Sequence, residues 1–462
     1  MKRFVAAIFM ILGGLSLSAQ SFEEYKARAQ KEFAEYKSNR EKEYQEYRDK
    51  VNAEFAQYMR QAWRKYQGEP AVPEPEKIPD VPPVVLPELE LPEIPDNEIP
   101  YIDYLPIDFK NLDPVPLVPL MEVPEHDPVP EQIPDVSDPE PVPLTPAPEP
   151  KEPVLNLVFY GTPCSLRFDV NAKIMMNGAS EDSAADMWDA MCSGNYDDLL
   201  TDCLEIRRML GLCDWAYYEL SRKVSETVYG RGNEAVMLSM FLLNQAGYRT
   251  RLGREGADVL HLLVGMEDGI YNHPCFTLKG YDYYLLDDED IESLYVFDME
   301  MPEEKSLSLS ITRRQSFSDD RSDAGRLKAD AYPSADVRVD VNRNLMDFYG
   351  SYPHPFRSAA EHDTWVFYAE APLSAHLERQ LLLPLAEAIN GMSQEDAANL
   401  LINFVQTAFR YMTDGDQWGY ERAFFPEETL YYPYSDCEDR AILYARLVRE
   451  ILGLDVVFLH YP

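Results

Sequence analysis

The spacing of aromatic and charged positions near the N-terminus predicts one long helix. From Ser21 an eleven-residue unit occurs four times, and each unit carries a pair of aromatic residues. Eleven residues in three turns correspond to 3.67 residues per turn, so the aromatic residues form a nearly straight stripe on one side. No glycine or proline interrupts the pattern before Gln67-Gly68-Glu69-Pro70, which predicts a helix over residues 21–67. The pairs are Phe22/Tyr25, Phe33/Tyr36, Tyr44/Tyr47 and Phe55/Tyr58.

A one-sided aromatic stripe on an otherwise charged helix predicts a contact partner. Three partners fit the pattern: other copies of the helix in a bundle, the segment that follows the helix, or cell-envelope material. In each case the helix has a structural role and not a chemical one.

The segment over residues 68–153 is rich in proline and acidic residues. Between Pro70 and Pro153 lie 25 of the 36 prolines, with 20 acidic and three basic side chains. Because proline disrupts helices and central strands, we expect a polyproline II spacer of at most about 260 Å at roughly 3.1 Å per residue. The alternative is a solvated linker. Apolar residues among the first prolines suggest a further hypothesis, that Pro70 to Phe109 folds back along the aromatic stripe.

Helical and strand-like patterns from residue 154 onward predict a first globular unit, residues 154–315. Two short strands come first, four amphipathic helices follow, and a run of strands completes the unit. Several helices that lead into an antiparallel sheet are typical of an α+β fold. The expected strands are 155–160, 165–168, 248–252, 259–264, 275–278 and 281–286, and the expected helices are 183–192, 196–210, 214–228 and 233–246.

A second unit over residues 316–462 begins with a polar run, residues 316–328. Alternating residues predict strands at 306–311, before this boundary, and at 337–341, and a further strand is expected at 364–369. Helices are expected at 374–390 and 394–411. Ser393 with Asp396 three residues later forms a capping box at the start of the second of these.

The last helix of the second unit carries a cysteine in its first turn. Apolar residues recur at helical spacing over 441–451, and Gly453 is typical of a helix C-terminus. Ser435 or Asp436 caps the start, which puts Cys437 beside the unpaired N–H groups at the positive end of the helix dipole. Such a position favours a thiolate, the nucleophile of acyl transfer. Cys437 is therefore a candidate catalytic residue, and the alternative is a buried or disulfide-bonded cysteine.

The features around Cys437 follow one another in an informative order. The run Asp436-Cys437-Glu438-Asp439-Arg440-Ala441 is followed by a helix, Gly453 and the apolar run Val456-Val457-Phe458-Leu459. This order resembles the nucleophile segment of the transglutaminase-like superfamily of papain-type folds. The resemblance implies a Cys-His-Asp triad with the histidine on the next strand and the aspartate on the one after. The chain stops at Pro462, so we expect both partners beyond it, with His460 as the alternative base, and interpret the chain as truncated.

The first unit contains a segment similar to the one around Cys437. Aligning Gly247 with Gly453 pairs Arg231 with Cys437. Under the resemblance the first unit is a degenerate transglutaminase-like module, in which His261 and Asp287 lie on later strands where the family has its histidine and aspartate. A guanidinium cannot attack a carbonyl, so Arg231 would serve packing or ligand binding. The alternatives are a core histidine at 261 and a solvated acidic turn at 287.

The N-terminus and the net charge bear on the compartment. Lys2 and Arg3 precede an apolar run, and the small residues Ser18 and Ala19 follow it, which is the layout of a secretory signal peptide over residues 1–20. The net charge of −39 argues against nucleic acid and anionic membrane surfaces as partners. No later segment has the length of a membrane span. We expect an exported bacterial protein, periplasmic or secreted.

The cysteines and acidic residues match no metal motif. No two of the six cysteines form a C-x2–4-C pair, and Asp414-Gly-Asp416 lacks the other oxygen ligands of an EF-hand. We therefore expect neither a metal nor a cofactor. Six cysteines are too few for a disulfide scaffold, and the distance of Cys437 from the others favours a free thiol. The cysteines that could pair with one another are Cys164, Cys192, Cys203, Cys213 and Cys275.

Two functions fit these patterns. In the first, an exported transglutaminase-like enzyme hydrolyses or transfers an amide acyl group of a peptide or protein through a thioester on Cys437, and family analogy favours hydrolysis. In the second, degenerate papain-like modules on a coiled N-terminal region form a non-catalytic envelope scaffold or binding protein. Aromatic residues before Cys437 line an acyl-donor cleft or belong to the core. They are Trp418, Tyr420, Phe424, Phe425, Tyr431, Tyr432 and Tyr434.

Overall fold

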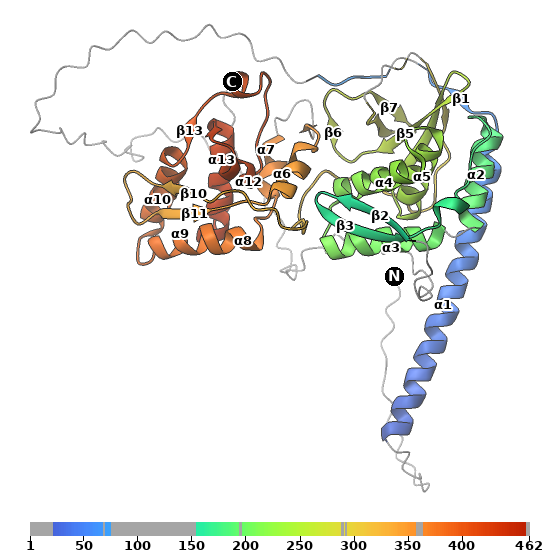
Figure 1. Ribbon diagram of the computed structural model, residues 1–462, viewed down its shortest axis with the longest axis horizontal. Coiled ribbons are helices and arrows are strands. Elements are labelled where there is room, and N and C mark those ends of the chain that lie inside the picture. Colours follow the sequence, from blue (N-terminus) through green and yellow to red (C-terminus); the bar gives the residue numbers. More distant parts are fainter. Residues whose placement is uncertain are drawn as a thin grey trace, which may run out of the picture. The chain divides into compact units, whose positions relative to one another are not determined.

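The computed structural model describes residues 22–67, 70–74, 154–193, 196–287, 291, 293–356 and 364–458. Helices and sheets are both present, and the predicted α+β class is confirmed (Figure 1). The signal peptide and the proposed contact of residues 75–109 with the aromatic stripe lie outside the described residues, as does most of the proline-rich spacer. None of the described helices has the length and apolar character needed to cross a membrane.

The N-terminal helix is shorter than the sequence pattern predicts. Helix α1 (Phe22–Met59) ends well before Gln67. The indole of Trp63 donates a hydrogen bond to the Met59 carbonyl at 3.0 Å, and the chain then forms β1 (Arg64–Lys65), which pairs with another strand. Tyr66, expected on the helical stripe, instead packs edge-on against Phe276 with ring centroids 5.1 Å apart. Strand pairing and side-chain burial have outweighed helix propensity in these residues.

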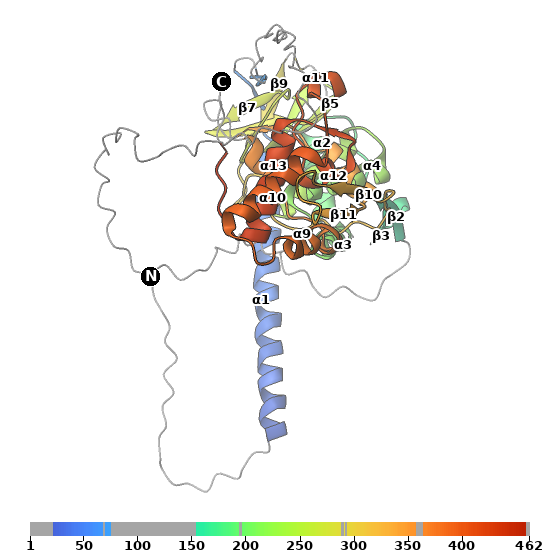
Figure 2. The same cartoon turned by 90° about the vertical axis from the view of Figure 1, so that its left-hand side faces the viewer.

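The last turns of α1 pack on the first globular unit. Phe55 contacts the rings of Trp188 and Phe297, with centroids 4.8 and 5.0 Å away, and Met59 is fully buried. Figure 1 shows this end of α1 beside α2, and Figure 2 shows the earlier turns of α1 extending away from the other helices. The partner of this part of the stripe is therefore the globular unit, which was not among the three predicted partners. Tyr47, one repeat earlier, is 53% exposed.

The first unit opens with a hairpin and four helices close to the predicted ranges. β2 (Val154–Phe159) and β3 (Thr162–Arg167) are joined by a two-residue turn at Tyr160 and Gly161, whose φ angles of 40° and 68° suit the twist of a hairpin. A short 3-10 helix, η2 (Val170–Ala172), follows. The four helices are α2 (Glu181–Ser193), α3 (Tyr196–Leu210), α4 (Asp214–Tyr229) and α5 (Asn233–Gln245).

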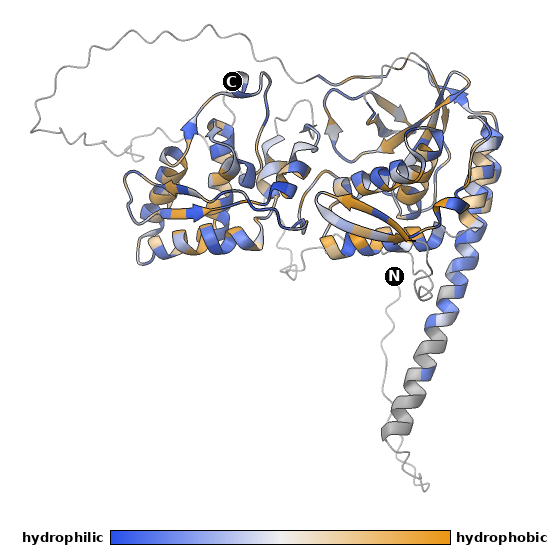
Figure 3. Cartoon of the chain, in the orientation of Figure 1, coloured by the Kyte–Doolittle hydropathy of each residue, from blue (hydrophilic) through white to orange (hydrophobic). Residues whose placement is uncertain are grey.

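Five strands after the helices form a six-stranded antiparallel sheet together with β1, and the sheet curls into a half-barrel. The strand order is β1-β9-β4-β5-β8-β7. Hydrophobic residues mark the strands and the helices that pack on them (Figure 3). On β5, Leu262 and Val264 belong to the large core that includes α5, whereas Leu263 belongs to a second cluster on the other face. The strands are β4 (Thr250–Glu255), β5 (Val259–Gly265), β7 (Cys275–Leu278), β8 (Tyr281–Leu285) and β9 (Leu294–Phe297).

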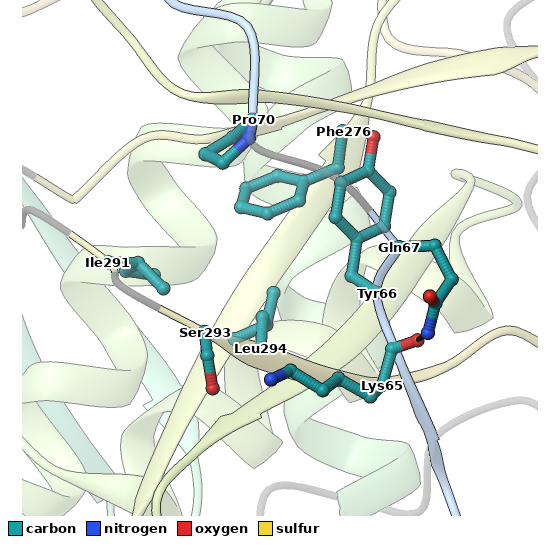
Figure 4. Close-up of a pocket in the computed structure, with 8 residues that line it drawn as sticks. All are labelled: Lys65, Tyr66, Gln67, Pro70, Phe276, Ile291, Ser293 and Leu294. Atoms are coloured by element: carbon teal, nitrogen blue, oxygen red, sulfur yellow. Dashed lines mark hydrogen bonds between the residues drawn. The ribbon is translucent and has the colours of Figure 1, made fainter.

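One short N-terminal segment contacts both edges of this sheet. β1 pairs with β9 at one edge, and Ala71 forms a bridge with Cys275 of β7 at the other. Because β1 is itself the outer strand beside β9, the segment extends the sheet at that edge and covers part of the other edge, where it reduces the unpaired backbone groups that would favour association with another chain. Residues of this segment also line a cavity of about 260 Å³ (Figure 4). Its lining residues are Lys65, Tyr66, Gln67, Pro70, Phe276, Ile291, Ser293 and Leu294.

The remaining chain is mainly helical. In the described residues it contributes to three short two-stranded sheets. β10 (Gly325–Lys328) pairs with β11 (Asp336–Val339), β13 (Arg410–Tyr411) pairs with β14 (Tyr434–Ser435), and β12 (Pro355–Phe356) pairs with β6 (Gly269–Ile270) of the preceding region. The helices are α6 (Arg343–Gly350), α7 (Thr364–Glu370), α8 (Ala375–Leu377), η3 (Glu378–Leu382), α9 (Leu383–Ala388), α10 (Gln394–Thr407), α11 (Asp414–Gln417), α12 (Pro426–Tyr431), α13 (Cys437–Leu447) and η4 (Val448–Leu452).

Two predicted strands in this region are wrong. Residues 364–369 belong to helix α7, where Phe367 and Tyr368 are buried and the helix packs on α13. A short apolar run does not distinguish a strand from a buried helix, and tertiary packing decides. Residues 306–311 form no strand, although Leu307, Leu309 and Ile311 are fully buried. Apolar and polar residues alternate here because the segment is extended and buries only one of its sides. It makes one isolated bridge, between Leu307 and Met266.

Candidate functional site

Cys437 is the first residue of α13 and is exposed. All six cysteines are free thiols, and the other five are buried or half-buried, so none of the disulfides considered above is formed. Burial raises the pKa of Cys275 to about 11 and the pKa values of Cys192 and Cys213 to about 12. Because the thiolate is the reactive form, accessibility and burial single out Cys437 as the thiol available to a reagent or substrate.

The predicted start and end of the helix that carries Cys437 are both present. Asp436 is the N-cap, and the helix continues through the wider turn η4 to Gly453, whose φ of +64° is the left-handed conformation of a helix C-terminus. Ile442 and Leu443 are fully buried, and the helix packs on α7, α10 and α12. The buried face of α13 fixes the position of its first turn.

A parallel bridge brings Tyr411 to Cys437. Tyr411 on β13 pairs with Ser435 on β14, two residues before the cysteine, and its hydroxyl oxygen lies 3.8 Å from the Cys437 sulfur. The hydrogen bond to Cys437 raises the pKa of Tyr411 to about 12, so the phenol keeps its proton at neutral pH. The guanidinium of Arg440 lies 5.4 Å from the centre of the Tyr411 ring.

Five carboxyl groups lie near the first turn of α13. One oxygen each from Asp414, Asp436 and Asp439 lie within 4.8 Å of one another, and so do single oxygens of Asp414, Glu421 and Glu438. Backbone amides hold part of the cluster in place. The amide of Phe424 donates to Asp439 Oδ1 at 2.8 Å and that of Asp436 donates to Asp439 Oδ2 at 3.2 Å, while the amide of residue 422 donates to Asp414 Oδ2 at 2.5 Å.

These carboxyl groups perturb one another. Burial, and then the charge of Asp436, raises the pKa of Asp439 to about 9 and that of Glu438 to about 8. Burial also raises the pKa of Asp414 to about 6, against a lowering by the hydrogen bond from the amide of residue 422. The fold therefore gathers acidic groups in a partly buried space beside an exposed thiol, and the raised pKa values mean that Asp439 and Glu438 keep their protons near neutral pH.

The aromatic residues before Cys437 divide between core and surface. Phe424 and Phe425 are buried, and Phe425 stacks on Tyr349 with centroids 4.1 Å apart, so the core alternative holds for these two. Tyr420 is 53% exposed. Trp418, Phe424 and Tyr432 surround the guanidinium of Arg422 at 4.5 to 5.5 Å from their ring centres.

No imidazole lies within hydrogen-bond distance of the Cys437 sulfur in the part of the chain that the structure describes. His376 contacts Asp340 with its Nε2 atom 2.9 Å from the carboxylate. Burial lowers the pKa of His354, and its ring lies 6.0 Å from that of Tyr420. His362 and His460 lie outside the described residues.

The residues singled out in the first unit do come together. His261 lies on β5, and Asp287 follows β8. These strands pair through Leu263 and Leu285, and the same antiparallel register places residue 261 opposite residue 287. Both line a cavity of about 380 Å³ at the N-terminus of α5, together with Arg231 and Asn233. His261 is 2% exposed, with Nε2 3.3 Å from Glu255 Oε2.

The structure shifts the correspondence between α5 and α13 by two residues from the alignment predicted from the sequence. Gly247 and Gly453 both have positive φ at the helix ends, but α5 begins at Asn233 whereas α13 begins at Cys437. The wide turn η4 accounts for extra residues before Gly453. Asn233, and not Arg231, therefore holds the first helical position that Cys437 holds in α13.

The Asn233 side chain forms hydrogen bonds to backbone groups, whereas the Arg231 side chain is mostly exposed. The Asn233 side chain donates to the Asp258 carbonyl at 2.8 Å and accepts from the Leu260 amide at 2.9 Å. The Arg231 side chain is 92% exposed and lies 4.0 Å from Glu226.

Sequence reasoning did not find the carboxylate cluster, because its members come from α11, the following loop and the start of α13 and form no motif. The local signals were Asp414-Gly-Asp416, which was set aside because it lacks the other oxygen ligands of an EF-hand, and the pair Asp436 and Asp439 at helical spacing. Comparisons of the chain with protein-family models, with curated proteins and with solved structures find no match.

Proposed function

We propose that this chain is an exported protein of the transglutaminase-like superfamily and that Cys437 is the nucleophile of amide hydrolysis or amide acyl transfer. The observation that carries the proposal is the exposure of the Cys437 thiol at the first residue of α13, whereas the other five thiols are buried or half-buried. A nucleophile must reach its substrate, and the N–H groups of a first helical turn favour the thiolate.

The reaction follows from this position. The sulfur attacks the carbonyl carbon of a peptide amide, a C–S bond forms, and the C–N bond breaks as the amine leaves with a proton. Water then attacks the thioester to give a carboxylic acid and the free thiol, or a second amine attacks to give a new amide. Backbone N–H groups at the start of α13 hold the oxyanion, and the Tyr411 hydroxyl lies 3.8 Å from the sulfur, where it can donate to the thiolate.

The general base is assigned to a histidine outside the described residues, of which His460 is one. The first unit supports the family assignment by the placement of its elements: helix α5, strand β4, strand β5 with His261, and strand β8 followed by Asp287. β6 and β7 lie between β5 and β8 in the chain, but β5 and β8 are neighbours in the sheet. The histidine and the aspartate are therefore near each other, as the resemblance implies, with Asn233 where a nucleophile would stand.

The first test is alkylation of the full-length chain with iodoacetamide near neutral pH, followed by peptide mapping. Cys437 should react faster than a small free thiol. Cys437→Ser should abolish the fast label, and Cys192→Ser, which removes a half-buried thiol, should leave it unchanged. A rate no greater than that of the free thiol contradicts the proposal.

A second test identifies the reaction. A peptide pool is incubated with the full-length chain, with and without a primary amine, and the products are analysed by mass spectrometry. New carboxyl termini indicate hydrolysis, and amine adducts indicate transfer. His460→Gln should suppress turnover if His460 is the base. Turnover that survives Cys437→Ser contradicts the assigned nucleophile.

A second candidate function is peptide binding without chemistry by the first unit. The specific observation is the 380 Å³ cavity, which holds His261 and Asp287 but places Asn233 at the helix start. Val259 lines this cavity and is 43% exposed, so Val259→Trp should block entry without disturbing the core. Val158→Trp on the β2 hairpin, at 56% exposure, is the matched control. Equal peptide affinity of the two variants would argue against this function.

A further inference from the structure

We propose that Asp414, Asp436 and Asp439 form a binding site for a divalent cation of the calcium class, beside Cys437. One carboxylate oxygen from each residue lies within 4.8 Å of the other two. The three side chains are 2%, 6% and 1% exposed, respectively. The site is independent of the proposed function, because it holds whether or not Cys437 reacts.

An unpaired oxygen on one of the three clustered side chains points to a ligand. Asp436 Oδ1 is buried and has no hydrogen-bond partner in the part of the chain that the structure describes. Both oxygens of Asp439 and one of Asp414 accept backbone N–H groups, so the fold fixes these two side chains and leaves Asp436 Oδ1 unsatisfied. A buried charged oxygen without a partner is costly, and a bound cation would satisfy it.

The arginines near the cluster are engaged elsewhere. The Arg422 guanidinium forms an ion pair with Glu428 at 2.6 Å. Arg440 donates to the carbonyls of Gln406 and Phe409, each at 3.1 Å, and to Ser435. Among the described residues, no lysine, arginine or histidine forms an ion pair with Asp414, Asp436 or Asp439. The protein therefore brings three carboxylates together without a side-chain cation of its own.

The chemistry of the donors selects the kind of cation. Every donor is a carboxylate oxygen, and Glu421 and Glu438 form a second group around Asp414, so additional oxygens are close by. Calcium takes about six to eight oxygen ligands in irregular geometry, and water completes the set. Zinc and copper prefer nitrogen or sulfur donors. This inference revises the expectation of no metal, which rested on the absence of a contiguous motif.

The direct test is calcium titration of the chelator-treated full-length chain by calorimetry, with terbium luminescence as a second probe. Trp418 is suited to sensitise terbium, because its backbone amide donates to the Asp414 carbonyl at 2.7 Å. One site with a Kd below about 1 mM is expected. Asp436→Asn should weaken binding at least about tenfold, because loss of even an outer-shell partner of a metal ligand typically costs about 10–100-fold in affinity. Asp416→Asn, an exposed neighbour outside both groups, should bind like the parent.

Thermal unfolding distinguishes an Asp436 that binds the cation from one that only stabilises the fold. In chelator, Asp436→Asn should unfold at a higher temperature than the parent, because it removes a charge from a cluster of like charges. In calcium the order should reverse. No binding up to about 1 mM, equal affinity of Asp436→Asn and parent, or an unchanged order of unfolding temperatures would each overturn the proposal. Cys437→Ser should bind calcium normally, which separates failure of this site from failure of the proposed reaction.

Discussion

The hydroxyl of Tyr411 lies 3.8 Å from the sulfur of Cys437, although the two residues are 26 positions apart. The contact depends on the parallel bridge between β13 and β14, which sets Tyr411 beside Ser435 just before the helix. Because the hydrogen bond to Cys437 raises the pKa of Tyr411 to about 12, the phenol keeps its proton over the whole neutral range and can donate it in a hydrogen bond to the thiolate. Tyr411 is therefore a positioning residue for this thiol.

Tyr411→Phe should slow alkylation of Cys437 because it removes one donor to the thiolate. A net hydrogen-bond contribution of about 0.5–1.5 kcal/mol corresponds to a rate between about twofold and tenfold lower. The measurement is the iodoacetamide rate of the full-length chain at neutral pH. Tyr420→Phe, at an exposed tyrosine of the same region, should keep the parent rate. An unchanged rate in Tyr411→Phe would show that the phenol does not act on the sulfur.

Gly161→Ala should destabilise the protein through a clash as well as backbone strain. Gly161 has a φ of +68°, and a Cβ atom there would lie 2.2 Å from the Asn344 side chain. Asn344 donates to the Ser318 carbonyl at 2.7 Å, so it cannot move without losing that bond. Gly178→Ala is the matched control, because its φ is +84° and its Cβ would meet nothing within 4 Å.

The Gly178→Ala control measures only the strain of a positive φ, which costs an alanine about 1 kcal/mol. The Gly161 variant should lose more free energy of unfolding than the Gly178 variant in chemical denaturation. Equal losses would mean that the Asn344 contact does not constrain the turn.

Glu304→Ala should be strongly destabilising because it leaves the buried guanidinium of Arg251 without its carboxylate partner. Arg251 is 1% exposed and makes two hydrogen bonds to Glu304, at 2.9 and 2.5 Å. Breaking a buried pair by removing one partner costs about 3–5 kcal/mol. Asp336→Ala breaks the exposed pair of Asp336 and Arg326 and should cost much less stability, because solvent screens exposed ion pairs. Denaturant midpoints of the two variants that coincide would contradict this difference.

The sequence predicts the local elements well where caps and periodicity agree. Asn233 and Gly247 bound α5 close to the predicted range, and the Ser393 side chain accepts from the Asp396 amide as expected. Cys437 at the start of α13 follows from the same rules. These features depend on residues within a few positions of each other, so the sequence alone contains the information.

Features that depend on distant residues were not predictable from the sequence in this way. The helix at Thr364–Glu370 is set by packing on α13, and the early end of α1 is set by pairing of Arg64 with Val296. The carboxylate cluster joins Asp414 to Asp439 through the tertiary fold. No local pattern of apolar and polar residues records which segments will meet, so the site at Cys437 was predicted only as a helix terminus.

Glu427→Gln should change how stability depends on pH. Glu427 is 1% exposed, and its Oε1 accepts the Ser374 amide at 2.5 Å while its Oε2 has no partner among the described residues. Burial raises the pKa of Glu427 from 4.5 to about 7. Between these values the unfolded chain has released the proton and the folded chain retains it, so the stability that Glu427 contributes at low pH is lost as the pH rises towards 7.

The glutamine variant has the neutral form of this group at every pH, so the loss should be absent from its stability curve. The difference in unfolding free energy, variant minus parent, should increase between about pH 4.5 and 7, by up to roughly 3 kcal/mol at 1.4 kcal/mol per pKa unit. Urea denaturation at a series of pH values measures it. Glu387→Gln, at an exposed glutamate of α9, should follow the parent curve. Parallel curves for Glu427→Gln and parent would mean that Glu427 is ionised in the folded protein and that its burial is compensated by a group outside the described residues.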